Sequence, residues 1–196
     1  MTQTAHDFSN GEQIYGLALS AGIGGLELGI RLALGAERYR TVCYVEWESY
    51  AASTLVARMA AQEMDDAPIW DDVKTFDGRP WRGVVDLLTA GYPCQPFSNA
   101  GLKRGTDDPR HLFPHIARII RECEPRICFF ENVGAHLRLG FREVKSELES
   151  LHYRVEAGLF SAEQMGAPHE RERLFILAIA ERAGLGKMAL PAQGQQ

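Results

Sequence analysis

The chain has 196 residues, of which 45% are hydrophobic and 24% are charged, and its formal net charge is −5 at pH 7. This length and this hydrophobic content predict one domain that buries a single sizeable core. The acidic balance argues against a general coat of positive charge for nucleic acid, although a local basic face can still bind phosphate on an acidic protein.

The ends of the chain predict neither a secretion signal nor a membrane segment. Residues 1–13 form a polar N-terminal extension without the basic start and apolar core of a signal peptide, and no stretch is apolar enough to span a bilayer. We expect a cytoplasmic protein whose single domain covers residues 14–182, followed by a disordered tail over residues 183–196. The cysteines at positions 43, 94, 123 and 128 have neither paired spacing nor a nearby histidine cluster, so neither a metal site nor a disulfide framework is expected.

Apolar runs and stretches of helical periodicity alternate along the chain. The predicted strands cover residues 14–19, 41–45, 68–70, 84–89, 126–130, 153–160 and 174–180. The predicted helices cover residues 26–34, 50–62, 111–123 and 141–151. Strands that alternate with helices predict an α/β fold in which a mostly parallel sheet is covered on both faces. The last two strands are too close in the chain for a helical crossover, so the final strand should be antiparallel to the one before it.

The turn after the first predicted strand carries Gly22, Gly24 and Gly25. Such glycines let backbone approach a ligand at the amino end of the next helix. Taken alone, they are equally consistent with an ordinary tight turn. Glu46 ends the second strand, where a carboxylate can accept hydrogen bonds from both hydroxyls of a ribose. Together these residues predict a nucleoside pocket.

Two neighbours of this pocket each allow two interpretations. Trp47 could pack on the sugar and base of the ligand, or it could pack in the core. Asp72 ends the third strand, where its carboxylate could accept a hydrogen bond from an exocyclic amine such as that of adenine. It could equally cap a helix or a turn.

The fourth predicted strand leads into the run Ala90–Ser98, in which Cys94 stands between two prolines. A cysteine at the carboxyl end of a buried parallel strand points into the ligand crevice and is a candidate nucleophile, although a lone cysteine is more often a small buried hydrophobe. Glu131 closes the next apolar strand, so its carboxyl group should be partly desolvated and should hold a proton more readily. A glutamate on the surface at a strand end is the alternative. We expect Asn132 to fix this loop.

These motifs carry a family resemblance. In chain order they are Gly-Ile-Gly-Gly, Glu46-Trp47, Pro93-Cys94-Gln95, Glu131-Asn132-Val133, and Arg171-Glu172-Arg173 before an apolar strand. Over residues 14–180 their order and spacing resemble the DNA cytosine-5 methyltransferases. The resemblance implies a Rossmann-like methyltransferase fold with a seven-stranded sheet, and it makes the nucleoside pocket a site for S-adenosylmethionine.

The resemblance also implies which residues contact the cofactor. They are Ser20, Gly22, Ile23, Gly24, Gly25, Glu46, Trp47, Asp72, Val73, Gly91 and Pro93. The family usually has an aromatic residue where Ser20 stands, so we expect one weaker cofactor contact. His169 stands where the family has a glutamine before its arginine pair.

The chemistry implied by the resemblance is covalent catalysis on a flipped cytosine. The Cys94 thiolate attacks carbon 6, Glu131 contacts and protonates nitrogen 3, and carbon 5 then takes the methyl group. Because this attack is impossible inside a stacked duplex, the base must be flipped out. Arg171 and Arg173 match the arginine pair of the family, which binds the flipped base; a solvated charged turn is the alternative.

The segment Ser98–Arg110 resembles the mobile loop that closes over DNA in this family. The DNA-binding residues implied by the resemblance are Gln95, Ser98, Lys103, Arg104 and Arg110.

The family continues after its seventh strand into a target recognition domain and a final segment of the cofactor pocket, whereas here we expect only a short polar tail. Three hypotheses follow. The chain is the catalytic domain of a DNA cytosine-5 methyltransferase whose recognition half comes from a second polypeptide or is dispensed with. Alternatively it methylates cytosine in RNA. The third hypothesis is a truncated phage or prophage remnant that binds cofactor or DNA without turnover, as an interaction module.

Overall fold

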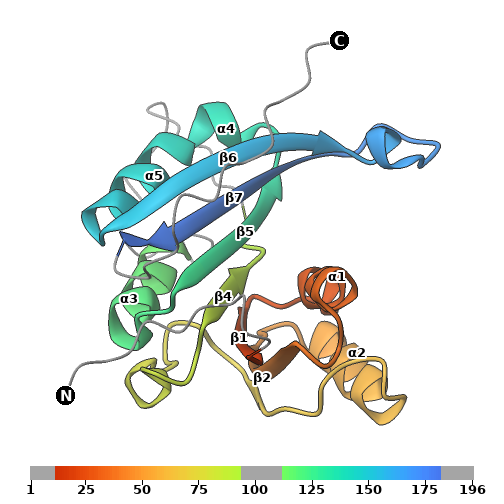
Figure 1. Ribbon diagram of the computed structural model, residues 1–196. Helices are drawn as coiled ribbons and strands as arrows, with labels where there is room; N and C mark the ends of the chain where they lie inside the picture. The colour runs from red at the N-terminus through yellow and green to blue at the C-terminus, as the bar shows by residue number, and fades with distance from the viewer. Residues whose placement is uncertain (1–11, 94–111, 182–196) are drawn as a thin grey trace.

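The computed structural model describes residues 12–93 and 112–181, and it shows one seven-stranded sheet in the order β3-β2-β1-β4-β5-β7-β6 (Figure 1). The strands are β1 (Ile14–Leu19), β2 (Tyr39–Val45), β3 (Ile69–Trp70), β4 (Leu87–Ala90), β5 (Ile127–Val133), β6 (Tyr153–Ser161) and β7 (Glu172–Ala180). All neighbouring strands are parallel except that β7 runs antiparallel to both β5 and β6. The predicted mixed sheet is therefore confirmed. Its antiparallel strand is last in the chain but lies inside the sheet.

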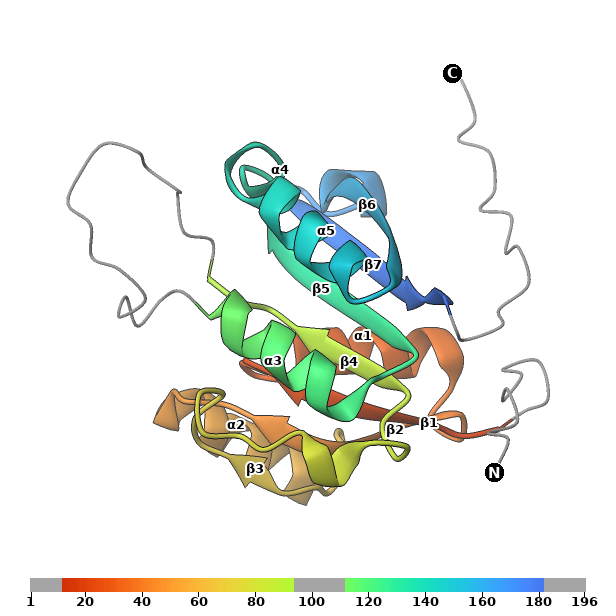
Figure 2. The same cartoon turned by 90° about the vertical axis from the view of Figure 1, so that its left-hand side faces the viewer.

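Helices cover both faces of this sheet. They are α1 (Gly25–Leu34), α2 (Ser49–Ala60), α3 (Phe113–Cys123), α4 (His136–Leu139) and α5 (Phe141–Ser150), with two short 3-10 turns, η2 (Arg79–Trp81) and η3 (Glu163–Met165). The two views show α3 and α5 on one face and α1 and α2 on the other (Figures 1 and 2). This arrangement leaves the carboxyl ends of the parallel strands at one edge, where α/β proteins bind their ligands.

The main core lies beneath α3 and α5. Alternate residues of β7, from Leu174 to Ala180, are buried there, as expected for a strand with one face on the core. On α3, Ile116, Ile119 and Ile120 are fully buried because helical spacing places them on one face. The helix ends where Glu124 adopts a left-handed conformation, with φ of 50°, directly before Pro125.

Several element boundaries differ from those predicted, among them those of β4, β5 and β7. Strand β4 begins at Leu87 rather than at Val84, because the backbone amides of Val84 and Val85 donate to Trp81 and continue the turn after η2. Strands β5 and β7 are longer than predicted, because their antiparallel pairing continues to Val133 opposite Arg173. Glu131 and Arg173 therefore lie inside strands. The short helix α4 was not predicted.

Within the described residues, no helix is long and apolar enough to cross a membrane. Residues 1–11 and 182–196, which include most of the expected extension and all of the expected tail, lie outside the described part of the chain.

Candidate active site

Glu46 joins the end of β2 to the glycine turn after β1. Its carboxylate is buried, and Oε2 accepts a hydrogen bond from the backbone amide of Gly22 at 2.6 Å while Oε1 accepts one from Glu48 at 2.7 Å. Each carboxylate oxygen can accept a second hydrogen bond. The structure thus places Glu46 beside the turn, as the sequence predicted, and gives it a role in holding the turn that the sequence did not show.

The glycine turn exposes backbone at the start of α1. Gly22 and Gly24 have φ of 56° and 81°, in the left-handed region that favours glycine. A Cβ atom on Gly22 or Gly25 would meet nothing within 4 Å in the described structure, whereas one on Gly24 would lie 2.6 Å from the Met64 side chain. The open side of the turn is therefore the side at Gly22 and Gly25. Ile23 between them is 52% exposed, and Ser20 leads into the turn with φ of 48°.

Asp72 caps a tight turn over residues 72–76. Its Oδ1 accepts from the amide of Lys74 at 2.8 Å, and its carbonyl accepts from the amides of Thr75 and Phe76 at 3.1 Å. The capping interpretation of Asp72 is therefore confirmed. Its Oδ2 accepts no hydrogen bond from the described residues, so contact with an exocyclic amine stays a prediction. Val73 is buried directly after it.

Trp47 is 71% exposed, so the interpretation that it packs in the core is wrong. Its ring lies at the end of β2, one residue from the buried Glu46 carboxylate. An exposed indole next to a buried acceptor is available to pack on a ligand.

Ser20 and Gly91 directly follow the ends of β1 and β4, and Glu131 on β5 lies close to both. A Cβ atom placed on Gly91 would lie 3.6 Å from Glu131 Oε2 and 3.8 Å from the Ser20 carbonyl oxygen. These are ordinary contact distances. The backbone of Gly91 therefore lies between the glycine turn and the Glu131 carboxyl group. The structure brings the two predicted groups of residues together at one edge of the sheet.

Glu131 is paired with a cation. Its Oε1 lies 2.6 Å from Arg173 Nε, and the two side chains are 28% and 22% exposed. The strand register explains the pair, since Val133 lies opposite Arg173 and Glu131 is two residues back on the same face. Both residues were predicted as site residues from the sequence, but their contact was not. Arg171 is exposed, and its side chain makes no bond with the described residues.

Cys94 and the predicted DNA-binding residues lie outside the described residues, but the approach to Cys94 is visible. Asn132 Nδ2 donates to the Tyr92 carbonyl at 2.9 Å, and its Oδ1 accepts from the Val133 amide. Asn132 therefore fixes the chain two residues before Cys94, as expected. Pro93 is exposed at the end of this described stretch.

Tyr92 and His136 hold the same segment of backbone before Cys94, and neither was predicted as a site residue. The Tyr92 hydroxyl lies 3.1 Å from His136 Nε2, and both residues are buried. The Tyr92 ring also packs against Phe113 and Phe130. Burial lowers the pKa of His136 below its ordinary value of 6.5, although Glu143 acts in the opposite direction. The pattern offered no signal for this pair, because His136 lies in a helix too short to show periodicity.

The three described cysteines are buried thiols. Burial raises the pKa of Cys43 to about 11 and that of Cys123 to about 12. Since the thiolate is the nucleophilic form, these two cysteines are unsuited to covalent catalysis at neutral pH.

Comparison with protein families finds a match to C-5 cytosine-specific DNA methylase over residues 15–193. The chain is 35% identical over 171 residues to Type II methyltransferase M1.ScrFI of Lactococcus lactis subsp. cremoris. The aligned residues make up 84% of this chain and 41% of that protein. It is 32% identical over 178 residues to Type II methyltransferase M.HhaI of Haemophilus parahaemolyticus, and these residues make up 88% of this chain and 51% of that protein. The chain thus spans at most about half the length of these two relatives.

Solved structures show the same fold. The S. pombe Dnmt2 methyltransferase matches with a TM-score of 0.70 at 23% identity, over 86% of this chain and 51% of that chain. A mutant of Spodoptera frugiperda DNMT2 matches with a TM-score of 0.71 at 20% identity, over 94% of this chain and 54% of that chain. The Rossmann-like methyltransferase architecture predicted from the sequence is confirmed.

Proposed function

The chain belongs to the C-5 cytosine-specific DNA methylase family, and we propose that it transfers a methyl group from S-adenosylmethionine to carbon 5 of cytosine in DNA. One observation carries this proposal. The Glu131–Arg173 ion pair lies at the strand-end edge that also carries the glycine turn, next to the backbone that leads to Cys94.

The residues at the turn fit a nucleoside cofactor. Glu46 keeps acceptor capacity for ribose hydroxyls, because each of its oxygens accepts one backbone amide. Gly22 and Gly25 leave space beside the turn, and Trp47 offers an exposed ring. Asp72 Oδ2 is free of bonds from the described residues and can accept from an exocyclic amine. S-adenosylmethionine, when bound here, supplies the methyl group. The contacts of Ser20, Ile23, Val73, Gly91 and Pro93 with it are part of the proposal.

Cys94 and Glu131 divide the chemistry on the base. The Cys94 thiolate forms a bond to carbon 6 while the Glu131 carboxyl group gives its proton to nitrogen 3, so that the ring becomes an enamine with a nucleophilic carbon 5. After methylation, carbon 5 loses its proton to water, the bond from sulfur to carbon 6 breaks, and nitrogen 3 returns its proton to Glu131, which restores the thiolate and the aromatic ring. Arg173 holds Glu131 Oε1, so that the carboxylate has one orientation during these steps.

Access to carbon 6 requires a base flipped out of the duplex. We propose that Arg171 and Arg173 bind the flipped cytosine, and that Gln95, Ser98, Lys103, Arg104 and Arg110 contact the DNA. The type II relatives suggest a role in restriction and modification. Neither the comparisons nor the contacts of the described residues support a second polypeptide, so the proposal does not include one.

Methyl transfer from labelled S-adenosylmethionine tests the proposal. We expect the label to enter DNA at cytosine, the Cys94→Ser variant to transfer none, and Cys43→Ala, which removes a buried thiol, to retain transfer. Label in RNA rather than DNA would support the RNA hypothesis instead. Cofactor binding without transfer to either substrate would contradict the proposed activity and support the remnant hypothesis.

A further inference from the structure

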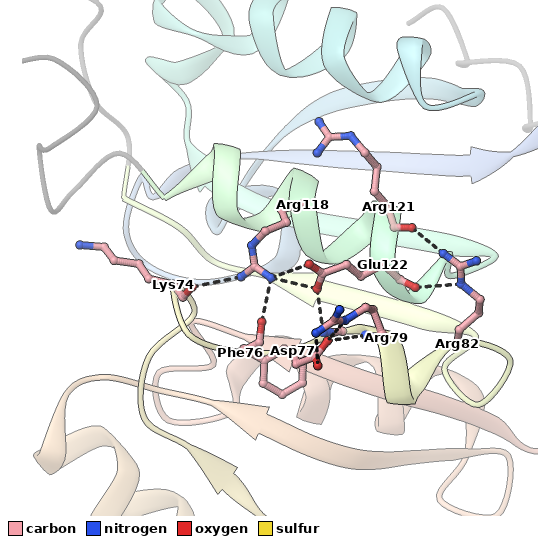
Figure 3. A network of polar contacts seen from close by, with 9 residues as sticks. Lys74, Phe76, Asp77, Arg79, Arg82, Arg118, Arg121 and Glu122 are labelled. Atoms are coloured by element: carbon pink, nitrogen blue, oxygen red, sulfur yellow. Dashed lines mark hydrogen bonds and ion pairs between the residues drawn. The ribbon is translucent and has the colours of Figure 1, made fainter.

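Arg118 on α3 holds the turn that follows β3. Its guanidinium donates to three backbone carbonyls of one turn: Nη1 to Phe76 at 2.9 Å, and Nη2 to Val73 at 3.0 Å and to Lys74 at 3.3 Å (Figure 3). The side chain is 32% exposed, so it is about two-thirds covered by the turn and the helix. The turn therefore curls around one side chain that comes from far along the sequence.

Glu122 orients this arginine. Both of its carboxylate oxygens accept from Arg118 Nη1, at 2.8 and 2.9 Å, and Oε2 also accepts from the Gly78 amide at 2.8 Å. Gly78 lies so close to α3 that a Cβ atom there would be 3.0 Å from Glu122 and 3.1 Å from the Ile119 carbonyl oxygen. A planar guanidinium with five donors can bind the carboxylate and the carbonyls at once, which the ammonium group of lysine cannot do.

A second arginine ties the same loop to α3 further along. Arg82 donates from Nε to the Glu122 carbonyl at 2.9 Å and from Nη2 to the Arg121 carbonyl at 3.0 Å. Figure 3 shows Arg82 at the other end of the network from Lys74, with Arg118 and Glu122 between them. Arg118 is the member whose side chain touches the 72–76 turn itself.

Packing holds the turn as well, because Val73 and Phe76 are buried in the main core and the Phe76 ring packs against Trp70 and Trp81. Strand β3 has two residues and lies at the edge of the sheet. Asp72 caps the amides at the start of the turn, while Arg118 satisfies the carbonyls of Val73, Lys74 and Phe76. In addition to this packing, the backbone that carries Asp72 and Val73 is held by a hydrogen-bond network that starts on α3.

We infer that Arg118 is a positioning residue for cofactor binding: it fixes Asp72 and Val73 where they can contact the nucleoside. The inference rests on the proposed function, in which those two residues bind S-adenosylmethionine. Arg118 itself does not touch the cofactor in this account. Its loss should therefore weaken cofactor binding while the chemical step, which depends on Cys94 and Glu131, is kept.

The test compares cofactor affinity with turnover in Arg118→Met. We expect the dissociation constant of S-adenosylmethionine, measured by calorimetry, to rise roughly tenfold, because binding must then also order the turn that Arg118 no longer holds. Turnover at saturating cofactor should stay within about twofold of the unmodified chain, since its barrier is set elsewhere. Arg118→Lys should restore part of the affinity, because an ammonium group can still donate to one or two of the carbonyls.

Arg121→Met is the matched control. It removes the same charge from the same helix, but its side chain pairs with Glu147 on α5 and makes no bond to the 72–76 turn. We expect its cofactor affinity to be unchanged. Thermal unfolding with and without S-adenosylmethionine adds a second readout, because a ligand that binds more weakly stabilises the fold less. Arg118→Met should show a smaller increase in melting temperature than Arg121→Met.

Equal cofactor affinity in Arg118→Met, Arg118→Lys and the unmodified chain would overturn the inference, and so would an equal loss in Arg121→Met. If Arg118→Met does not fold, the lysine variant decides, since the inference requires weaker cofactor binding there as well. Failure of the unmodified chain to bind S-adenosylmethionine would overturn the proposed function, and this inference with it.

Discussion

Glu131 and Arg173 form the pair on which the proposed chemistry depends. Their ion pair is partly buried, and it comes from neighbouring antiparallel strands whose register puts both side chains on one face. Because the planar guanidinium of Arg173 holds one oxygen of Glu131, the carboxyl group of Glu131 has a fixed orientation. The contact with nitrogen 3 requires such an orientation. Arg173 is therefore expected to act through orientation as well as through charge.

Arg173→Met tests this role. We expect the rate of a single turnover to fall roughly 100-fold, because acid–base catalysis by Glu131 depends on its orientation toward nitrogen 3. Arg173→Lys keeps the charge and should lose less. The cofactor dissociation constant should not change in either variant, because Arg173 lies on the Glu131 side of the site. An unchanged single-turnover rate in Arg173→Met would contradict the assignment.

Glu27 is a buried carboxyl group in the first turn of α1. Its Oε1 accepts from the Thr89 hydroxyl at 2.6 Å, whereas Oε2 is buried and has no hydrogen-bond partner among the described residues. Burial raises the pKa of Glu27 above its ordinary value of 4.5, and the bond from Thr89 only partly opposes this. The folded chain therefore binds the Glu27 proton more tightly than the unfolded chain does.

The sign of the resulting pH dependence follows from linkage. Because the folded-state pKa is raised, the stabilisation from protonated Glu27 is complete below pH 4.5 and is lost as the pH rises through the folded-state pKa. We expect the free energy of unfolding of the unmodified chain, relative to Glu27→Gln, to decrease as the pH rises from 4.5. Denaturant unfolding of both proteins across this range measures the difference. The lowered pKa of His136 makes the free energy of unfolding rise with pH below 6.5, which is the opposite trend. Both proteins contain His136, so its contribution cancels in the difference. A difference that rises with pH would contradict the account.

The glycine turn is the element that joins the fold to the cofactor site. Gly24 has a φ of 81° and faces Met64, so a side chain there is strained, whereas Gly25 begins α1 and faces open space. The two neighbouring glycines thus serve different purposes. The first is required by the conformation of the turn, and the second leaves room for a ligand.

Two alanine variants separate these purposes. We expect Gly24→Ala to lower the free energy of unfolding by about 1–3 kcal/mol, because a non-glycine residue in this conformation is strained. Gly25→Ala should change stability by less than about 1 kcal/mol, since alanine is favourable in a helix. Its cofactor affinity should nevertheless fall, because the methyl group occupies the open side of the turn. If Gly25→Ala binds S-adenosylmethionine as well as the unmodified chain, the ligand does not use this side.

At the scale of the whole molecule, the features that could be predicted were those with local signals. Alternation of strands and helices predicted the sheet and the helices on both of its faces, and the order of the motifs predicted which strand ends form the site. Contacts between distant segments could not be predicted. The Glu131–Arg173 pair depends on the register of β5 and β7. The hydrogen bond from Gly22 to Glu46 depends on the path of the backbone directly after β2. The contacts of Arg118 join segments that sequence reasoning treated separately.

The start of β4 shows the same limit in a predicted element. Val84 and Val85 have the apolar character of a strand, yet their amides donate to Trp81 and extend the turn after η2. Gly83, with φ of 77°, permits this turn. Strand propensity was therefore overridden by a tertiary feature, the docking of the 73–82 loop on α3.

The proposed catalysis requires Cys94 to form a covalent bond to cytosine during methyl transfer. Trapping on DNA that contains 5-fluorocytosine tests it most directly, because fluorine at carbon 5 prevents the elimination step and leaves the enzyme attached. With S-adenosylmethionine present, we expect an adduct that survives denaturation and is absent in Cys94→Ser. Methylation of ordinary cytosine without any adduct on the fluorinated DNA, or an adduct that persists in Cys94→Ser, would contradict it.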